Sequence, residues 1–501
     1  MTVIGALKLT PESDALGAMS AAIAARYQVV PLRIEDDVLV VAMEDPERVD
    51  VLDQLRVVLE RRVRAERHPA RLIAEAIREH YGLGADTLEK LVGERHVEIV
   101  SDVSGAAIDD MAADASIIKF VNQLIVDAYK SRATDIHLEP FERKLRVRYR
   151  IDGILFNANI PENVRHFREA IVSRIKIMAN LDIAERRLPQ DGRIQVRIAG
   201  EDFDLRVSVI PIAHGESVNL RILQRSSVLM GLESIGFTRD HLDTFAPLLA
   251  KPHGIILLTG PTGSGKTTTL YACLSSINET ERKIITVEDP VEYQMEGICQ
   301  MQARPDIGLS FAAGLRSMLR HDPDVMLIGE IRDFETAELA IRCALTGHLV
   351  FSTLHTNDAP GAMPRLIDIG VEPFLLASSI QAVVAQRLIR TNCEACSAPS
   401  SPDPAVVRHF NYPAKTQPSF RSGKGCDHCR GSGYRGRTAI HEILLIDDGV
   451  REAIVAKSPA SVIRKHALAH GMTPLRQDGF VKAALGITTL EEVLRVTQED
   501  R

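Results

Sequence analysis

Apolar residues in this chain follow two spacings, which alternate from one end of the sequence to the other. Continuous apolar runs, such as VLVVAM at 38–43 and GIILLT at 254–259, predict buried strands. In ARLIAEAIREHYG at 70–82 the apolar residues recur every three or four positions, which predicts a helix that ends at a glycine. Strands and helices in mixed order predict an α/β protein, and even the most apolar runs are far shorter than a membrane span.

Changes in composition mark the domain boundaries. The stretch 86–112 is rich in acidic, small and glycine residues with weak periodicity, so we expect a linker there. After it, the helical pattern SIIKFVNQLIVDAYKSR and several alternating strands predict a second domain. The expected segments are a small α/β domain at 1–85, a linker at 86–112, the second domain at 113–225, another linker at 226–245 and a larger α/β domain at 246–501 with a cysteine-containing insertion at 390–437.

The composition narrows the classes of function. The 501 residues exceed what one hydrophobic core usually supports, and they carry a net charge of -7 at pH 7. With no tryptophan, 4% aromatic residues and no net basic charge, the chain is poorly supplied with the stacking platforms and phosphate track of a nucleic-acid motor. The first residues, MTVIGALKLT, do not resemble a signal peptide, so we expect a cytoplasmic protein that binds no nucleic acid.

A phosphate-binding loop follows the apolar run GIILLT. The sequence GPTGSGKT matches G-x-x-x-x-G-K-[ST], with a predicted strand before it and a helix-forming segment after it. Glycines in such a loop let backbone N–H groups surround phosphate oxygens, Lys266 can reach the β and γ phosphates of ATP, and Thr267 can hold Mg²⁺. The residues expected to bind the nucleotide here are Gly260, Pro261, Thr262, Gly263, Ser264, Gly265, Lys266, Thr267 and Thr268.

Three further apolar runs end in residues suited to phosphoryl transfer. Glu288 ends KIITVE, Glu330 follows DVMLIG and His355 follows HLVFSTL. Because a ligand lies outside the carboxyl ends of the strands in an open parallel sheet, these side chains should converge on the phosphates. We expect Glu330 to position Mg²⁺ through water or to orient the attacking water, Glu288 to orient that water, and His355 to contact the γ-phosphate. A structural cap or ion pair is the alternative for each of the three.

Arginines occupy alternate positions in the predicted strands of the second domain. The segments LRVRYRI at 145–151, RIQVRI at 193–198, FDLRVSVI at 203–210 and VNLRIL at 218–223 all place arginine opposite apolar residues. Successive side chains of a strand point to opposite faces, so one face of this sheet should form the core and the other should carry guanidinium groups. These groups either contact the γ-phosphate of ATP or form an ordinary solvated face.

The cysteines suggest one metal site. Four of the seven form two CxxC pairs in a glycine-rich segment, and two such pairs can offer four thiolates to one zinc ion. A redox dithiol is the alternative, but it needs one active CxxC beside a βαβ pattern. We therefore expect a structural Zn²⁺ site at Cys393, Cys396, Cys426 and Cys429, and small buried residues at Cys273, Cys299 and Cys343.

Several of these segments resemble the signature motifs of the secretion ATPase superfamily. TGPTGSGKTTTLY, ITVEDPVEY, LRSMLRHDPDVMLIGEIRD and TGHLVFSTLHTND are similar to its Walker A motif, aspartate box, atypical Walker B motif and histidine box. ATDIHLEP, RYRIDGIL and LPQDGRIQVRI resemble the ATPases that assemble secretion pseudopili and type IV pili. IKIMANLDIAERRLPQDGRI is most similar to type II secretion ATPases, and the resemblance covers about residues 113–501.

The resemblance implies a fold and a role for particular arginines. It implies a RecA-like P-loop ATPase core with an inserted tetracysteine zinc module, preceded by an α+β (PAS-like) domain and a small N-terminal α/β domain. It also places arginines that contact phosphate in the second domain, with Arg193 and Arg206 as the best matches and Arg221 as a weaker third choice.

The resemblance further implies partners and a location. The family is expected to form a homo-hexamer at the cytoplasmic face of the inner membrane and to drive pseudopilus assembly by hydrolysing ATP. Its N-terminal domain would bind the cytoplasmic domain of an inner-membrane secretion protein, a platform protein would be a second partner, and membrane contact would be indirect. The basic run RRVRAERHPAR at 61–71 is either a docking surface or a solvated face. A type IV pilus assembly ATPase and, from a different class, a nucleic-acid translocating motor are the alternatives.

Overall fold

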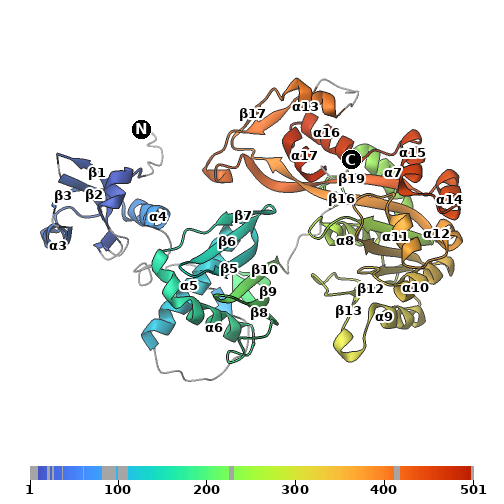
Figure 1. Ribbon diagram of the computed structural model, residues 1–501, viewed down its shortest axis with the longest axis horizontal. Helices are drawn as coiled ribbons and strands as arrows, with labels where there is room; N and C mark the ends of the chain where they lie inside the picture. The colour runs from blue at the N-terminus through green and yellow to red at the C-terminus, as the bar shows by residue number, and fades with distance from the viewer. Residues whose placement is uncertain are drawn as a thin grey trace. The chain divides into compact units, whose positions relative to one another are not determined.

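The structure is a computed structural model that consists of two compact units, Met1–Ser226 and Ser227–Arg501 (Figure 1). Each unit is described by itself. None of the described helices combines the length and the apolar composition that are needed to span a bilayer. The described residues are 9–19, 23–24, 27–36, 38–59, 61–81, 97–99, 111–224, 231–410 and 418–497.

The first unit begins with a three-stranded sheet, ordered β1-β2-β3, and its helices. β2 pairs antiparallel with β1 and parallel with β3. The apolar run of β2 is buried, and Leu55 and Ile73 from two helices belong to the same core as Leu39 and Val41. The elements are α1 (Ser13–Gly17), β1 (Val30–Glu35), β2 (Val38–Met43), α3 (Val49–Leu59), β3 (Arg62–Arg67) and α4 (Ala70–Tyr81).

The basic run on β3 is paired with acidic residues. Arg64 forms an ion pair of 2.6 Å with Glu35, and Arg67 lies 3.5 Å from Asp45. These side chains are about half exposed, so the pairs stabilise the sheet only weakly. Such pairing is typical of a solvated face.

The first unit continues with an antiparallel sheet ordered β4-β8-β9-β10-β5-β6-β7. On β6, Val147 and Tyr149 are buried while the arginines between them are only partly covered. Leu124 of α5 and Ile171 of α6 lie in one core with Val147, so helices cover the apolar face. The elements are β4 (Val97–Ile99), α5 (Met111–Lys130), β5 (Ala133–Pro140), β6 (Leu145–Ile151), β7 (Ile154–Asn157), η1 (Glu162–Phe167), α6 (Arg168–Met178), β8 (Gln190–Ile198), β9 (Glu201–Ile212) and β10 (Gly215–Gln224).

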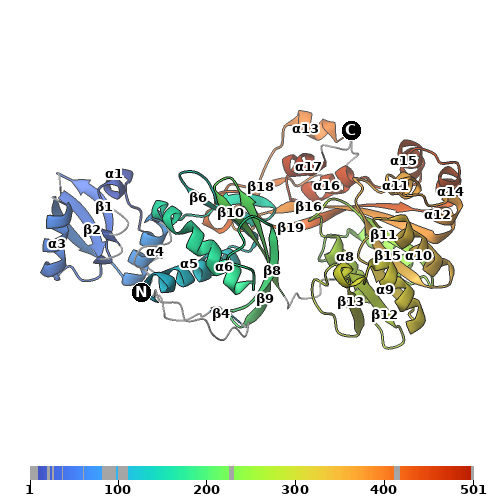
Figure 2. The same cartoon turned by 60° about the horizontal axis from the view of Figure 1, so that its bottom comes forward.

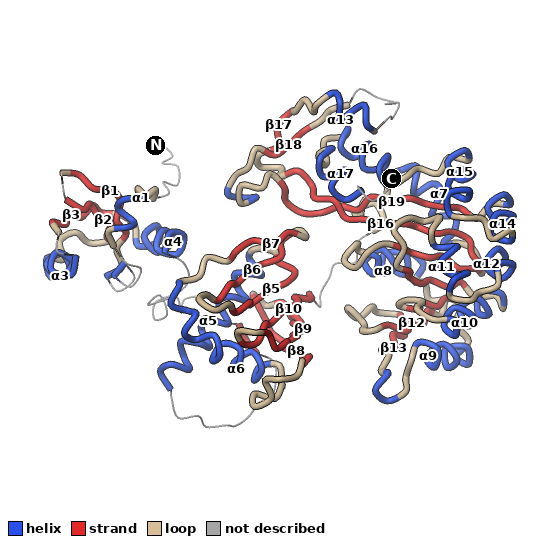
Figure 3. Tube along the Cα trace, in the orientation of Figure 1, coloured by secondary structure: helices blue, strands red, loops and turns tan. Residues whose placement is uncertain are grey.

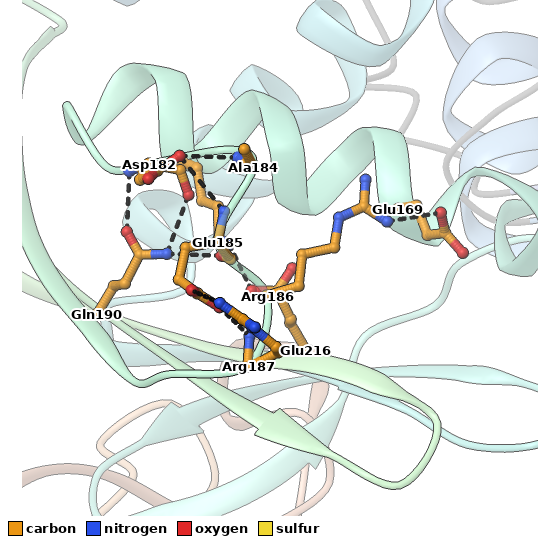
Figure 4. A network of polar contacts seen from close by, with 9 residues as sticks. Glu169, Asp182, Ala184, Glu185, Arg186, Arg187, Gln190 and Glu216 are labelled. Carbon is orange, nitrogen blue, oxygen red and sulfur yellow. Dashed lines mark hydrogen bonds and ion pairs between the residues drawn. The ribbon is translucent and has the colours of Figure 1, made fainter.

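The segment between α6 and β8 is held by a network of polar contacts (Figure 4). The Lys176 side chain is 1% exposed, donates a hydrogen bond of 2.7 Å to the Glu185 carbonyl and forms an ion pair of 2.5 Å with Glu216. Gln190 bonds the Asp182 carbonyl at 2.9 Å and accepts a bond from the Asp182 N–H at 2.8 Å. This network fixes the chain immediately before β8, the strand that carries one of the candidate phosphate-contacting arginines.

The second unit contains a seven-stranded sheet ordered β13-β12-β14-β15-β11-β16-β19 (Figure 2). All neighbouring strands are parallel except β16 and β19, which are antiparallel. Figure 3 shows the helices and strands of this unit in different colours. Its first elements are α7 (Arg239–Leu249), β11 (Gly254–Thr259), α8 (Lys266–Ile277), β12 (Ile284–Glu288), β13 (Ile298–Gln302), η2 (Pro305–Ile307), α9 (Phe311–Met318), η3 (Leu319–His321), β14 (Val325–Ile328), α10 (Phe334–Leu345) and β15 (Leu349–Leu354).

Both faces of this sheet are buried. On the central strand β11, Ile255 and Leu257 belong to one core cluster, and Ile256 and Leu258 belong to another. A strand covered on both faces is expected to read as a continuous apolar run, which is why GIILLT does not alternate. The remaining elements are α11 (Ala362–Asp368), α12 (Pro373–Ser379), β16 (Ile380–Asn392), β17 (Ser397–Pro399), α13 (Pro404–His409), β18 (Arg421–Gly423), η4 (Asp427–Cys429), β19 (Tyr434–Leu445), α14 (Asp448–Val455), α15 (Ala460–Ala469), α16 (Leu475–Ala484) and α17 (Leu490–Thr497).

Three expected boundaries differ from the structure. The expected linker 86–112 contains β4, which pairs with β8. The expected linker 226–245 contains the start of α7, and Phe237 and Phe245 are buried in the core of the second unit. The expected insertion 390–437 is narrower, because β16 and β19 stay paired as far as Asn392 and Tyr434.

A buried histidine cluster joins α7, β19 and α16 in the second unit; its members are His241, His441, Asp478 and Lys482. Lys482 donates hydrogen bonds of 2.6 Å to Asp478 and to the Ala439 carbonyl, and Asp478 accepts the backbone N–H of His441 at 2.8 Å. Burial, with the nearby charges of Lys482 and His241, holds the pKa of His441 well below its usual value. His441, on β19, is therefore a neutral imidazole within this cluster.

Candidate active site

The phosphate loop connects the carboxyl end of β11 to the first residue of α8. Gly260, Gly263 and Gly265 have φ of 145°, 79° and 85°, a region that side chains rarely adopt. A Cβ on Gly260 would lie 2.4 Å from the Gln386 carbonyl oxygen. The loop conformation and its close contact with β16 both require glycine, which is the local reason for the motif.

Lys266 is the first residue of α8, and its side chain turns back over the loop. Its Nζ donates hydrogen bonds of 2.7 Å to the Gly260 carbonyl and 3.2 Å to the Pro261 carbonyl. Burial lowers the pKa of Lys266, and the charge of Glu330 opposes that shift. The ammonium group is therefore held at the loop by weak neutral acceptors, which phosphate oxygens can replace.

The side chain of Gln386, on β16, holds the phosphate loop in position. Gln386 is 2% exposed, donates a hydrogen bond of 2.7 Å to the Ser264 carbonyl and accepts one of 2.7 Å from the Thr269 hydroxyl. One amide thus ties the loop to the first turn of α8. The hydroxyl of Ser264 is buried without a hydrogen-bond partner among the described residues.

The carboxyl ends of β14 and β15 bring Glu330 and His355 together. Nε2 of His355 lies 3.1 Å from Oε2 of Glu330, and Arg332 forms an ion pair with the other carboxylate oxygen. Burial acts to raise the pKa of Glu330, but the hydrogen bonds from Arg332 and His355 outweigh it and the net pKa is lowered. Glu330 is thus an ionised carboxylate, 13% exposed, whose charge acts on Lys266.

Glu288 ends β12 with both of its oxygens engaged. It accepts hydrogen bonds from the Tyr271 hydroxyl, from Thr286 at 2.6 Å and from Gln300 at 3.3 Å. Burial raises the pKa of Glu288, and these three donors oppose the shift. The burial of Glu288 favours the alternative that it is structural, because its carboxylate is shielded from water, whereas Glu330 is partly exposed.

Other predicted nucleotide ligands lie around the loop. Pro261, Thr262 and Gly263 are exposed, Thr267 is half-buried and Thr268 is exposed. The structure adds two residues to the candidate active site: Gln386, which is hydrogen-bonded to the phosphate loop, and Arg332, which pairs with Glu330. Arg332 stands two positions after Glu330 in the motif itself, whereas Gln386 has no local signal in the sequence.

The candidate arginines lie in the first unit, and two of them, Arg193 and Arg221, pair with aspartates of their own sheet. Arg193 holds both carboxylate oxygens of the buried Asp204, with 2.9 Å between Nε and Oδ1. Arg221 donates to Asp135 at 3.0 Å. Arg206, on β9 beside Arg193, is half-buried. These carboxylates hold guanidinium groups in place on one face of the sheet.

The two cysteine pairs lie together in the insertion between β16 and β19. The Sγ–Sγ distances are 3.9 Å for Cys393 and Cys426, 3.8 Å for Cys396 and Cys429, and 3.7 Å for Cys426 and Cys429. Tetrahedral zinc with Zn–S bonds of about 2.3 Å separates its sulfurs by about 3.8 Å, whereas a disulfide requires about 2.05 Å. The four sulfurs thus fit one tetrahedral ion.

Backbone geometry supports the cysteine cluster. The N–H groups of Cys426 and Gly433 donate to the Cys429 sulfur at 3.1 and 3.3 Å. Burial acts to raise the pKa of Cys429, but these bonds lower it to about 6, which favours the thiolate that binds a metal. Gly433 has φ of 77°, and a Cβ on Gly423 would lie 1.9 Å from its carbonyl oxygen.

The prediction for the three scattered cysteines is wrong at one position. Cys273 and Cys343 are buried, but Cys299 is exposed. The reason is that Cys299 lies on β13, the edge strand of the sheet, where fewer neighbouring elements cover a side chain.

Comparison with known proteins places the chain among secretion ATPases. The type II/IV secretion system protein family matches residues 110–495, and the MshEN domain matches residues 2–87. Type IV pilus assembly ATPase PilB of Myxococcus xanthus is 44% identical over 498 residues, which are 98% of this chain and 88% of that protein. Type II secretion system ATPase E of Vibrio cholerae is 50% identical over 387 residues, 77% of this chain and 76% of that protein.

A further relative and two solved structures also match this chain. Type II secretion system protein E of Xanthomonas campestris is 48% identical over 430 residues, 85% of this chain and 75% of that protein. The crystal structure of the pilus retraction motor PilT with bound ADP matches with a TM-score of 0.50 at 26% identity, over 75% of this chain and 96% of that one.

The Legionella pneumophila ATPase DotB shares the fold, with a TM-score of 0.55 at 20% identity over 76% of this chain and 95% of its own. The family match extends over residues 110–495 and so includes the phosphate loop and the acidic residues around it. Because relatives at 44% to 50% identity cover most of the same sequence, this protein belongs to the type II/IV secretion system protein family and is an ATPase.

Proposed function

We propose that this ATPase powers pseudopilus assembly and protein export by a type II secretion system. The observation that carries the proposal is an ionised carboxylate, Glu330, at the strand ends beside a phosphate loop whose lysine is bound only to carbonyl groups. Relatives named as type II secretion system proteins are 48% and 50% identical to the chain. Hydrolysis at this site is the reaction that such a machine uses as its energy source.

The chain's own residues divide the work of hydrolysis. Backbone N–H groups of the loop and Lys266 would bind the phosphates of ATP, and Thr267 would hold Mg²⁺, which would supply positive charge near them. Glu330 orients the attacking water, and the contact with His355 fixes its carboxylate. Glu288, which is buried and bound by Tyr271 and Thr286, supports the strand end rather than the water.

The tetracysteine cluster is proposed to bind one structural zinc ion. The sulfur distances of 3.7 to 3.9 Å support a closed tetrahedral site without an open position for substrate. Zinc would stabilise the segment between β16 and β19, whose apolar residue Phe410 packs against Phe480 of α16 and Val493 of α17.

We further propose that the active site is completed in a homo-hexamer. Arg193 and Arg206, and more weakly Arg221, are proposed to reach the γ-phosphate from the PAS-like second domain toward the RecA-like core. The support is that cross-strand pairing puts all three on one face of the sheet, where aspartates hold Arg193 and Arg221. If so, Arg193→Ala and Arg206→Ala each lower turnover by at least about tenfold, roughly 1.4 kcal/mol, without loss of secondary structure. Near-normal turnover of both variants under hexamer-forming conditions would indicate that these arginines only form an ordinary solvated face.

The proposed partners follow from the family. The N-terminal domain would bind the cytoplasmic domain of an inner-membrane secretion protein, and a platform protein would be the second partner, which makes the ATPase a peripheral protein of the cytoplasmic face. This arrangement is tested by ATPase activity measured against protein concentration, with and without the partner's cytoplasmic domain. A steep rise with either is expected, and a specific activity independent of both would contradict it.

Type IV pilus assembly is the second candidate function. The Myxococcus PilB relative aligns with 98% of the chain, whereas the two type II relatives align with 77% and 85%. A gene deletion complemented with wild type or Lys266→Ala separates the two functions. Type II secretion predicts that exported proteins disappear from the medium while surface pili remain, and the reverse result would assign the protein to pilus assembly.

A further inference from the structure

An ion pair joins the loop after β15 to α15 in the second unit. Asp358 follows His355 by three positions, and its carboxylate pairs with the guanidinium group of Arg464. The two side chains are 22% and 30% exposed, so the pair is partly shielded from water. We propose that Asp358 and Arg464 are positioning residues for ATP hydrolysis, because they hold the loop that carries His355. This role rests on the proposed function of Glu330, whose carboxylate His355 contacts.

Asp358 is held through both carboxylate oxygens and through its backbone. One oxygen accepts the N–H of Gly361, the residue before α11, at 2.7 Å, and the other pairs with Arg464. The backbone carbonyl of Asp358 accepts a hydrogen bond of 2.9 Å from the Thr356 hydroxyl. Hydrogen bonds between charged groups are roughly twice as strong as neutral ones, so Arg464 restrains this carboxylate more firmly than a neutral donor could.

The same loop is bonded to two strands of the nucleotide-binding sheet. The Thr356 N–H donates to the hydroxyl oxygen of Thr259 at 2.8 Å, and Thr259 is the last residue of β11, directly before the phosphate loop. The Ala359 N–H donates to the buried carboxylate of Glu442, on β19, at 2.9 Å. The backbone of the loop is thus bonded to β11 and β19, and the side chain of Asp358 attaches it to α15.

His355 depends on its backbone for its position. Its side chain is 51% exposed, so packing restrains the ring only weakly, yet Nε2 lies 3.1 Å from the carboxylate of Glu330. A misplacement of about 1 Å can lower the rate of an enzyme about 100-fold, so a looser loop should lower kcat. The phosphate loop is held separately by Gln386 and should still bind ATP.

The test measures kcat and the KM for ATP with full-length protein under hexamer-forming conditions. Asp358→Asn keeps an oxygen for the Gly361 N–H but loses the charge, and Arg464→Gln removes the guanidinium group. Each variant is expected to lower kcat about tenfold and to change KM by less than about twofold. Arg464→Lys keeps the positive charge and should retain at least about half of the wild-type kcat. Arg342→Gln removes an exposed ion pair with Glu338 on α10 and, as the matched control, should leave kcat unchanged.

A double variant tests whether the two residues act as a pair. If Arg464 acts through Asp358, the kcat of Asp358→Asn/Arg464→Gln should be no lower than that of the slower single variant. Near-wild-type kcat in both single variants, losses that multiply in the double variant, or a tenfold loss in Arg464→Lys would overturn the proposal. A rise in KM as large as the fall in kcat would also overturn it, because it would indicate general loosening of the fold.

Glu330→Gln separates this result from a failure of the proposed function. Normal turnover of that variant would remove the role of Glu330 itself. An inactive Glu330→Gln together with fully active Asp358 and Arg464 variants would remove only the positioning role.

Discussion

Replacement of Gln386 by leucine tests whether β16 holds the phosphate loop in its binding conformation. The amide makes two buried hydrogen bonds of 2.7 Å, one to the Ser264 carbonyl and one from the Thr269 hydroxyl. Leucine has a similar volume but leaves both partners unsatisfied, and each unsatisfied buried group costs about 1–3 kcal/mol. Allowing for the apolar contacts of leucine, we expect a net local destabilisation of roughly 2–3 kcal/mol.

Two measurements report this effect. Hydrogen exchange of amides in the loop and the first turn of α8 should become faster, because the free energy of local opening falls by that amount. The dissociation constant for ATP should rise about tenfold, roughly 1.4 kcal/mol, because the loop must be ordered when the nucleotide binds.

A control on the same strand isolates the contact. Gln381 lies on β16 as well, and its side-chain oxygen accepts a hydrogen bond from the exposed Lys251. Gln381→Leu should therefore leave both exchange and affinity near wild type. Unchanged exchange and unchanged ATP affinity in Gln386→Leu would refute the idea that this amide positions the loop.

Three further outcomes are expected. Lys266→Ala and Glu330→Gln both abolish phosphate release from ATP, but only the lysine variant weakens nucleotide binding in a filter assay, since Glu330 acts after binding; normal turnover of Glu330→Gln would exclude its catalytic role. Cys396→Ser lowers the zinc content below one per chain and leaves nucleotide affinity intact, and wild-type protein purified without zinc would contradict the metal site. The unfolded chain binds a proton that buried His441 does not, so stability falls below about pH 6.5 by up to about 1.4 kcal/mol per pH unit, and His441→Leu should flatten that slope in urea unfolding.

The parts of the site that sequence could predict are local. The phosphate loop lies between a strand and a helix that follow one another within a short segment. One motif therefore predicts both phosphate binding and the local structure. The prediction of a secretion ATPase is confirmed by the family match over residues 110–495. Convergence of strand ends could also be predicted, because parallel strands share one edge for their carboxyl ends.

The parts that could not be predicted depend on distant contacts. Gln386 and Ser264 are 122 residues apart, and no spacing in the sequence links them. Cys299 was expected to be a small buried residue. It is exposed because β13 lies at the edge of the sheet. The segment before α7 has apolar residues in no regular order, and Phe237 is buried because it packs on a core built by later elements.

The pairing of β16 with β19 has a consequence for how this family can change. Asn392 and Tyr434 are the last paired residues of β16 and β19. The chain therefore leaves the sheet and returns to it at neighbouring positions. A short hairpin turn could join these two residues, because antiparallel neighbours lie only about 5 Å apart. The order of strands in the nucleotide-binding sheet is therefore independent of residues 393–433: this segment can be exchanged for another that covers Phe480 and Val493 while the sheet keeps every strand in register.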